Sequence, residues 1–333
     1  MGRMIWLLLI LIGCASKNPY ITGGIIDLRQ NRTEEAIHQF QKAIEVEPKN
    51  PDGYIWLGKA YATKKKFNPA CDEFEKAFTM DPTKKGKMTN ERDYFWAIYF
   101  NAGIEYLNKQ DFVGAEKRLK EAVDWSPDSS VTYNHLGLVY SQLDRDEEAI
   151  QSYRKSITLK PNDPEPRIQL ARILMEKERL EDVIPILEEA LAKNPESSQV
   201  HYYLGVAYFN KEMKEEARSH FQKAIELDPE YKDAYLDLGV TLIQQGQYPE
   251  ALTSLKRVTE LDEKDKEAWY LIGTAHLMMK EYDRAIEALT HSIEIDPSYA
   301  DAYYQRGVVK REKGLKKQAA EDFKRAEELK KGK

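Results

Sequence analysis

Seven prolines recur along this 333-residue chain at a nearly fixed interval, and each follows a segment with helical periodicity. Their successive separations are 34, 45, 34, 34, 34 and 68 residues. Such a period is typical of chains built from stacked supersecondary units that bury their apolar faces against one another. The spacing therefore predicts one continuous array of repeats, and not the two or three compact domains that the length alone suggests. The prolines are Pro48, Pro82, Pro127, Pro161, Pro195, Pro229 and Pro297.

Glycines and alanines recur with the same 34-residue period. Because glycine lacks a Cβ, a partner helix can approach it closely, and the alanines offer small matching residues on the second helix. The segment before Pro82 resembles the tetratricopeptide repeat (TPR) family pattern. The resemblance implies an all-α fold, a right-handed TPR solenoid of about nine helix-turn-helix repeats. The residues that carry it are Tyr54, Leu57, Gly58, Tyr61, Ala70, Phe74 and Ala77.

Counting from these residues gives nine repeats and one insertion. In the first repeat, Asn18-Pro19 and Gly23-Gly24 interrupt the first helix, which we expect to be short or frayed. The insertion, residues 85–95, adds eleven residues to the period. We interpret Gly86 as part of a loop, and Thr89 or Asn90 as the cap of a first helix that is extended backwards. The predicted repeats are residues 17–50, 51–84, 96–129, 130–163, 164–197, 198–231, 232–265, 266–299 and 300–333.

The N-terminus reads as an export signal. Arg3 precedes an unbroken apolar run, residues 5–12, that is too short to span a bilayer. Leu11-Ile12-Gly13-Cys14 resembles the lipobox of bacterial lipoproteins. That resemblance implies a signal peptide over residues 1–13, a lipid such as palmitate on Cys14, a tether over residues 14–17 and the solenoid over residues 18–333. By the same analogy Ala15 implies sorting to the outer membrane, facing the periplasm. An ordinary signal peptide with an incidental cysteine is the alternative.

Composition and motif content argue against nucleic-acid binding and catalysis. Fifty Lys and Arg against 56 Asp and Glu give a net charge of -6, which does not favour contact with phosphates. The sequence has no phosphate-binding glycine loop or cysteine cluster, and no two of its six histidines are three or four residues apart. We therefore expect no catalytic residue, no cofactor and no metal. We interpret His201 and His276 as packing residues, and Cys71 as a half-buried helix residue.

The TPR resemblance also implies where a partner binds, namely on the concave side lined by the first helix of each repeat. In repeats three to five these positions hold amides, which can grip the backbone of an extended peptide. In repeats six to nine they hold aromatic side chains, which suit apolar anchors from a bound helix or strand. An open alternative is that Tyr202, Phe209 and Tyr270 only pack against neighbouring helices. The candidate residues are Asn101, Asn134, His135, Gln169, Arg172, Tyr202, Tyr203, Phe209, Tyr270 and Tyr304.

A lipobox followed almost at once by TPR units resembles the pilotin-type TPR lipoproteins of type IV pilus and secretin systems. The resemblance implies a non-enzymatic, membrane-anchored scaffold of the bacterial cell envelope whose partner is a protein of a membrane-proximal complex. Two alternatives stay open. One is a general periplasmic scaffold that recruits cell-envelope or cell-wall enzymes. The other is an enzyme that uses the solenoid as a scaffold, which would need a separate catalytic domain.

Overall fold

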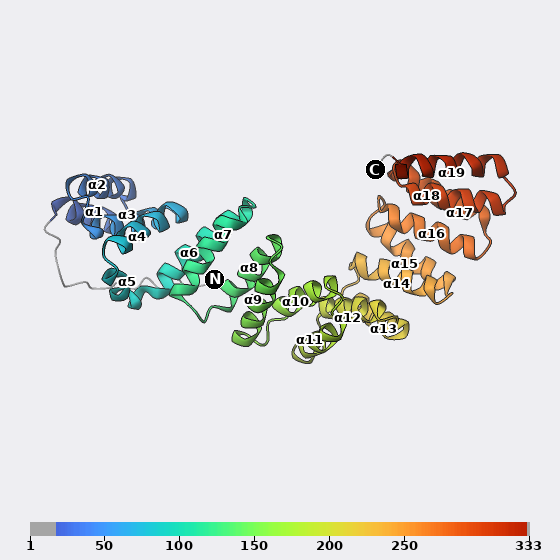
Figure 1. Cartoon of the computed structure of the whole chain (residues 1–333), viewed down its shortest axis with the longest axis horizontal. Coiled ribbons are helices and arrows are strands. Elements are labelled where there is room, and N and C mark those ends of the chain that lie inside the picture. The colour runs from blue at the N-terminus through green and yellow to red at the C-terminus, as the bar shows by residue number, and fades with distance from the viewer. Residues whose placement is uncertain (1–17, 332–333) are drawn as a thin grey trace. The chain divides into compact units, whose positions relative to one another are not determined.

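The computed structural model describes residues 18–331, and within them the chain is a succession of α-helices joined by short turns, without a β-strand (Figure 1). The helices divide into two compact units, one ending at Leu159 and the other beginning at Lys160. The first unit contains α1 (Pro19–Arg29), α2 (Thr33–Val46), α3 (Pro51–Thr63), α4 (Phe67–Met80), α5 (Thr83–Lys87), the 3₁₀ helix η1 (Thr89–Glu91), α6 (Arg92–Asn108), α7 (Phe112–Trp125), α8 (Ser130–Gln142) and α9 (Asp146–Leu159). The second contains α10 (Glu165–Glu176), α11 (Leu180–Lys193), α12 (Ser198–Asn210), α13 (Lys214–Leu227), α14 (Lys232–Gln244), α15 (Tyr248–Leu261), α16 (Lys266–Met278), α17 (Tyr282–Ile295), α18 (Ala300–Glu312) and α19 (Lys316–Lys331).

Successive helices pack as antiparallel pairs, such as α3 with α4 and α16 with α17. In every described pair except α10 with α11, where Ala171 takes its place, the repeat glycine of the first helix meets a large side chain of the second. A Cβ built on Gly58 would lie 2.6 Å from the Phe74 ring. Gly137 stands in the same relation to Tyr153, again at 2.6 Å. The prediction that small residues face each other is therefore refined, since the space left by the glycine is filled by a ring that lies four residues after the repeat alanine.

The first helix of the first repeat has 11 residues against 13 in α3, so it is short as expected, but neither Asn18-Pro19 nor Gly23-Gly24 interrupts it. Pro19 lies in the first turn of α1, where its missing N–H costs nothing, and Asn18 Oδ1 accepts a hydrogen bond from the Tyr20 N–H at 3.0 Å. Gly24 does not break α1 either. It lies against the Phe40 ring, and a Cβ there would come within 2.5 Å of that ring. Gly24 thus takes the same packing position as Gly58, 34 residues further along.

The insertion is more ordered than a loop. Gly86 lies inside the short helix α5, Thr89 begins η1, and α6 begins at Arg92, so the expectation of a loop at Gly86 is wrong. The expected backward extension of the first helix does occur. Two ion pairs tie α5 and η1 to α3: Lys84 of α5 pairs with Asp52, and Glu91 Oε2 of η1 lies 2.6 Å from Lys59 Nζ. These contacts hold α5 and η1 in place where the sequence alone suggests only polar, flexible residues.

In the described part of the chain, every turn within a helix pair contains one residue with a positive φ. In most of these turns the residue is not glycine. Lys65, for example, has a φ of 56°, a left-handed conformation that disfavours side chains with a Cβ. It places the next backbone N–H against an earlier carbonyl of the first helix: the Lys66 N–H donates to Tyr61 O at 2.9 Å. The residues are Asn31, Lys65, Gln110, Asp144, Glu178, Glu212, Gly246, Lys280 and Gly314.

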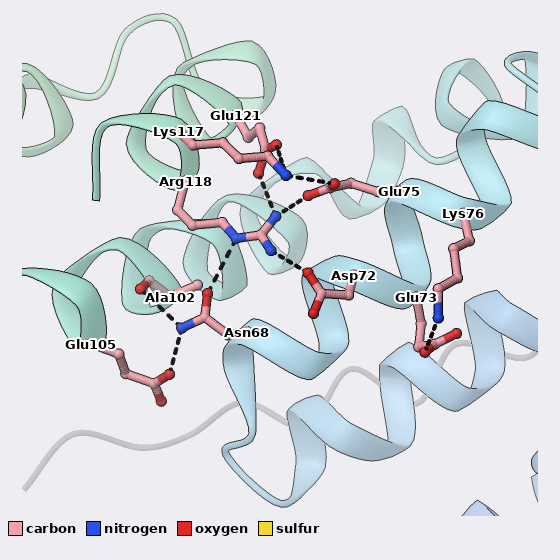
Figure 2. Close-up of polar contacts among 10 residues, drawn as sticks. All are labelled: Asn68, Asp72, Glu73, Glu75, Lys76, Ala102, Glu105, Lys117, Arg118 and Glu121. Carbon is pink, nitrogen blue, oxygen red and sulfur yellow. Dashed lines mark hydrogen bonds and ion pairs between the residues drawn. The ribbon is translucent and has the colours of Figure 1, made fainter. Parts of the chain in front are cut away.

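A polar network connects α4 to α7 across the insertion, as Figure 2 shows. The Arg118 side chain of α7 is only 3% exposed, and it forms ion pairs with Asp72 and Glu75 of α4. Its Nε also donates to Asn68 Oδ1 at 3.2 Å, and Nη1 lies 3.0 Å from Glu121 Oε2. A buried guanidinium needs such partners to offset the loss of its hydration. Arg118 therefore fixes the position of two helices that belong to different repeats.

Candidate partner-binding surfaces

The candidate residues of the first unit lie on two first helices, Asn101 on α6 and Asn134 and His135 on α8. We call these residues the amide surface. The Phe100 ring of α6 packs edge-to-face on the His135 ring, with 5.1 Å between centroids. Beside this contact is an open cleft of about 300 Å³. The lining residues are Ile104, Leu107, Asn108, Phe112, His135, Leu138 and Gln142.

The polar atoms of the amide surface differ in how well they are satisfied. Asn101 Nδ2 donates to the Ala97 carbonyl of its own helix at 2.6 Å, and His135 Nδ1 lies 2.8 Å from the Val131 carbonyl. In contrast, Asn134 Oδ1 is buried and has no hydrogen-bond partner among the described residues. A buried, unpaired amide oxygen costs free energy. Rotation of the Asn134 side chain toward solvent would relieve this cost and would present the amide to a backbone N–H.

Gln169 and Arg172 lie on α10, in the second compact unit, and hydrogen-bond to their own helix neighbours. Gln169 Nε2 donates to Glu165 Oε1 at 2.8 Å, and Arg172 Nη1 donates to Gln169 Oε1 at 3.1 Å. Arg172 is exposed. The two side chains thus form a small polar group of their own on α10.

The aromatic candidates lie on α12, α16 and α18, and with α14 these helices form a row in which each contacts the next. We call this face the aromatic surface. Tyr202 is half-buried, and its ring lies 4.9 Å from that of Tyr231 and 5.2 Å from that of Tyr203. Tyr270 repeats the arrangement against Tyr299, at 5.5 Å. These tyrosines therefore pack against neighbouring elements while part of each ring stays accessible.

The rest of the aromatic surface is more open. Tyr304 is 53% exposed and Met278 is 54% exposed, although both are large apolar side chains. Phe209 lines a pocket of about 190 Å³ between α12, α13 and α14. Exposed aromatic and methionine side chains are typical of surfaces that bind other proteins. The pocket is lined by Val206, Phe209, Asn210, Phe221 and Asp237.

Asp237 brings a carboxyl group into this largely apolar pocket. Burial raises the pKa of Asp237 to about 6, and interaction with the Tyr202 hydroxyl lowers it in part. Burial, together with the Asp237 charge, also raises the pKa of Tyr202. The pocket therefore holds one carboxylate, little hydrated, that can be neutralised by a proton or by a cation.

Sequence reasoning missed the acidic residues of the aromatic surface. Asp233, Glu267 and Asp301 are each the second residue of a first helix and are all exposed. Their 34-residue spacing is visible in the sequence and could have identified them. Asp237 had no such signal, because its burial depends on how α12 and α13 pack around it.

The structure also joins two histidines that their spacing does not suggest as a pair. His201 Nδ1 on α12 lies 3.0 Å from His220 Nδ1 on α13, and burial lowers the pKa of both side chains. Between residues 18 and 331, no group of three or more His, Cys, Asp or Glu side chains is arranged to hold a metal ion. No helix in the same range is long and apolar enough to cross a membrane.

Family comparisons agree with this arrangement of helix pairs. The model described as the Cilia and flagella-associated protein 70 C-terminal domain matches residues 13–233, about two thirds of the chain. Tetratricopeptide repeat models match residues 215–275, 267–299 and 300–333. The chain belongs to the tetratricopeptide repeat family that the first of these models describes. The predicted all-α TPR fold is thus confirmed.

Individual TPR proteins resemble the chain over part of its length. The type IV pilus assembly protein PilF of Pseudomonas aeruginosa is 28% identical over 161 residues, which are 48% of this chain and 60% of that protein. A TPR protein structure from Parabacteroides merdae shares the fold, with 22% identity, a TM-score of 0.56, and coverage of 71% of this chain and 93% of that one. The Pseudomonas aeruginosa PilF structure shares it with 19% identity, a TM-score of 0.57, and coverage of 66% and 99%. The chain matches less than two thirds of the length of each curated relative.

Proposed function

We propose that this TPR chain is a non-enzymatic scaffold, anchored by a lipid on Cys14, that binds other proteins in the periplasm. The observation that carries the proposal is that helix pairs occupy residues 18–331 and leave the amide and aromatic surfaces accessible. Surfaces of this kind, with partly exposed rings beside open clefts, suit protein contacts. Cys14 itself lies outside the described residues.

The more specific part of the proposal is that the chain assists assembly of a type IV pilus or secretin-type complex at the outer membrane. The 28% identity to the pilus assembly protein PilF supports it, as does the lipobox-like sequence that ends at Cys14. Between Cys14 and Asn18, where α1 is capped, the chain can span only ~10–15 Å. A lipid on Cys14 would therefore hold the first repeat close to the membrane, where a membrane-embedded partner is within reach.

Radioactive palmitate tests the anchor. We expect wild-type chain from envelope fractions to carry the label, and Cys14→Ala chain to lose both the label and membrane association. A Cys71→Ala variant serves as the matched control, because Cys71 is buried in α4 and should leave labelling unchanged. Equal labelling of wild type and Cys14→Ala would contradict the lipid anchor.

Crosslinking in intact envelopes followed by purification of the chain tests the partner. We expect a secretin or pilus component to be enriched, and Asn134→Ala or Tyr270→Ala to reduce its yield. The control is Glu226→Ala, an exposed residue on the second helix of its pair. Enrichment of cell-wall enzymes instead would favour the general envelope scaffold, and an unchanged yield from both variants would remove the proposed surfaces from the binding site.

A further inference from the structure

The aromatic surface combines apolar side chains with unbalanced negative charge. Asp233 on α14 and Glu267 on α16 are exposed and form no ion pair within the described part of the chain. Except for the exposed Arg311, which pairs with Glu312 of its own helix, the lysine and arginine side chains of the same row of helices form ion pairs with neighbouring segments. Those pairs are Lys232 with Asp262 and Asp265, Lys266 with Asp296, and Arg306 and Lys310 with Asp322.

The last repeat shows how a cation fits this surface. Lys330 of α19 lies 3.0 Å from Asp301 Oδ1, and its Nζ is 5.8 Å from the centre of the Tyr304 ring. A carboxylate and an aromatic face three residues apart on one helix thus bind the same ammonium group. In α16 the corresponding pair is Glu267 and Tyr270, and no lysine or arginine of the described residues pairs with Glu267.

The pocket at Phe209 fits the same chemistry. Phe209 and Phe221 form apolar walls, and the Asp237 carboxyl group lies among them in a volume of about 190 Å³. A lysine or arginine side chain has an aliphatic stem that can contact such walls while its charged end meets the carboxylate. Pairing with a cation would also offset the cost of keeping the Asp237 carboxylate buried.

We propose that the aromatic surface binds a basic, amphipathic segment of the partner protein, with Lys or Arg side chains at Asp233, Asp237 and Glu267 and apolar side chains against the tyrosines. This inference rests on the proposed function, because it names the class of partner segment that a protein-binding scaffold would take. Charge complementarity selects this occupant. An anionic membrane surface would be repelled by the same carboxylates.

Synthetic peptides that share one apolar face test the proposal directly. Their polar positions carry Lys, Gln or Glu, and fluorescence anisotropy measures their binding to the full chain with Cys14→Ala. We expect the Lys peptide to bind about tenfold more tightly than the Gln peptide, because several charge pairs of modest strength add together, and the difference to shrink as salt is raised. Equal affinity of the three peptides would overturn the proposal.

A charge-reversal pair locates the site. Asp233→Lys with Glu267→Lys should abolish the preference for the Lys peptide and create a preference for the Glu peptide. Glu226→Lys with Glu260→Lys is the matched control, since these residues are also exposed and 34 apart but lie on the second helices α13 and α15. Circular dichroism confirms that each variant is folded. If the control variant loses the preference to the same extent, the binding is non-specific and the proposal fails.

Two further outcomes separate this inference from the proposed function. If the envelope partner captured by the wild-type chain is still captured by the Asp233→Lys, Glu267→Lys variant, the inference fails and the scaffold function stands. If the wild-type chain captures no envelope protein, the scaffold function fails while the peptide measurements still decide the chemistry of the surface. Sedimentation measures whether the chain associates with itself. If the wild-type chain self-associates and the charge-reversal variant does not, the surface binds a second copy of the chain and the proposal is overturned.

Discussion

The Nδ1 atoms of His201 and His220 lie 3.0 Å apart, although 19 residues separate them in the chain. His201 Nε2 lies 3.3 Å from the Pro195 carbonyl, so the hydrogen-bond network assigns a proton to Nε2 and leaves Nδ1 to accept from His220. This arrangement suits two neutral rings. A proton added to His201 Nδ1 would place the N–H groups of both rings against each other, and a proton added to His220 Nε2 would leave a positive charge in a partly buried site.

The first prediction concerns the acid stability of this pair. Because burial lowers the pKa of both histidines in the folded chain, the unfolded chain binds more protons below about pH 6.5, and stability falls as the pH falls. We expect His220→Gln to reduce the loss of stability between pH 7 and pH 5, as measured by urea unfolding. His38→Gln, at an exposed position on α2, is the control. Parallel pH profiles for wild type and His220→Gln would refute this.

Asp237 should make the stability of the chain depend on pH in the opposite direction. Its pKa of about 6 exceeds the ordinary value of 3.8, so the folded chain binds more protons than the unfolded chain between these values. Its contribution to stability therefore falls as the pH rises through that window. We expect Asp237→Asn to stabilise the chain by on the order of 2 kcal/mol at pH 7.5 and by little at pH 4. Urea unfolding at both pH values measures this, and a gain that is equal at the two values would contradict it.

Gly24 and Gly23 provide a matched pair of substitutions in α1. A Cβ on Gly24 would lie 2.5 Å from the Phe40 ring, whereas a Cβ on Gly23 would lie 3.6 Å from the nearest atom of the Gln39 side chain. We expect Gly24→Ala to destabilise the first repeat by about 1–3 kcal/mol through overpacking. Gly23→Ala should stabilise it by up to about 1 kcal/mol, because alanine favours the helix. Hydrogen exchange of the α1 amides measures both, and equal effects would show that the Phe40 contact is not tight.

Arg118 should be required for the junction between α4 and α7. Replacing it with methionine leaves Asp72, Glu75 and Glu121 close together without their shared cation. We expect Arg118→Met to destabilise the first unit by about 2–3 kcal/mol, less than a fully buried pair because the carboxylates are partly exposed. Lys117→Met, whose side chain is 56% exposed, should change little.

Cys71 offers a local readout of that junction. It is buried in α4, and burial raises the pKa of its thiol, so it should react slowly with thiol reagents in the folded chain. In a Cys14→Ala background it is the only cysteine. Labelling of Cys71 should be faster in Arg118→Met than in Lys117→Met. Equal rates would mean that the Arg118 network does not hold α4 in place.

The left-handed turn residues supply the last prediction. Lys280 has a φ of 62°, and the equivalent residue of the following repeat is Gly314. We expect Lys280→Gly to stabilise the chain by up to about 1 kcal/mol, since relief of the left-handed strain exceeds the entropy that glycine adds to the unfolded chain. Gly314→Lys should have the opposite effect. Thermal unfolding of both variants measures the difference, and changes of the same sign would contradict the strain argument.

The sequence predicted the helix pairs well because their determinants are local and periodic. Gly58 and Phe74 are 16 residues apart, and the same separation links Gly137 to Tyr153. Each such pair fixes one hairpin without reference to the rest of the chain. Proline spacing gave the period for the same reason. The positions of the aromatic candidates followed from the period, since Tyr202, Tyr270 and Tyr304 lie on first helices.

The features that sequence reasoning missed depend on contacts between segments or on context. Gly86 suggested a loop, but the ion pairs of Lys84 and Glu91 with α3 hold α5 and η1 in place. Gly24 appeared to break a helix, yet the Phe40 ring needs the space. Lysine gives no hint of a positive φ at position 65, because the hydrogen bonds of the turn impose it. The excess negative charge of the aromatic surface could not be predicted, because the sequence does not show which carboxylates form ion pairs.

The ordered insertion also limits which side chains of α3 are open to a ligand in the first unit. Asp52 and Lys59 occupy positions of α3 that correspond to candidate binding positions in other repeats, and both are already paired, with Lys84 and Glu91. A peptide lying along the amide surface would meet these occupied side chains at α3. We therefore expect the footprint of a ligand on the amide surface to be limited by Lys84 and by Glu91 of the insertion, and not by the number of repeats that precede them.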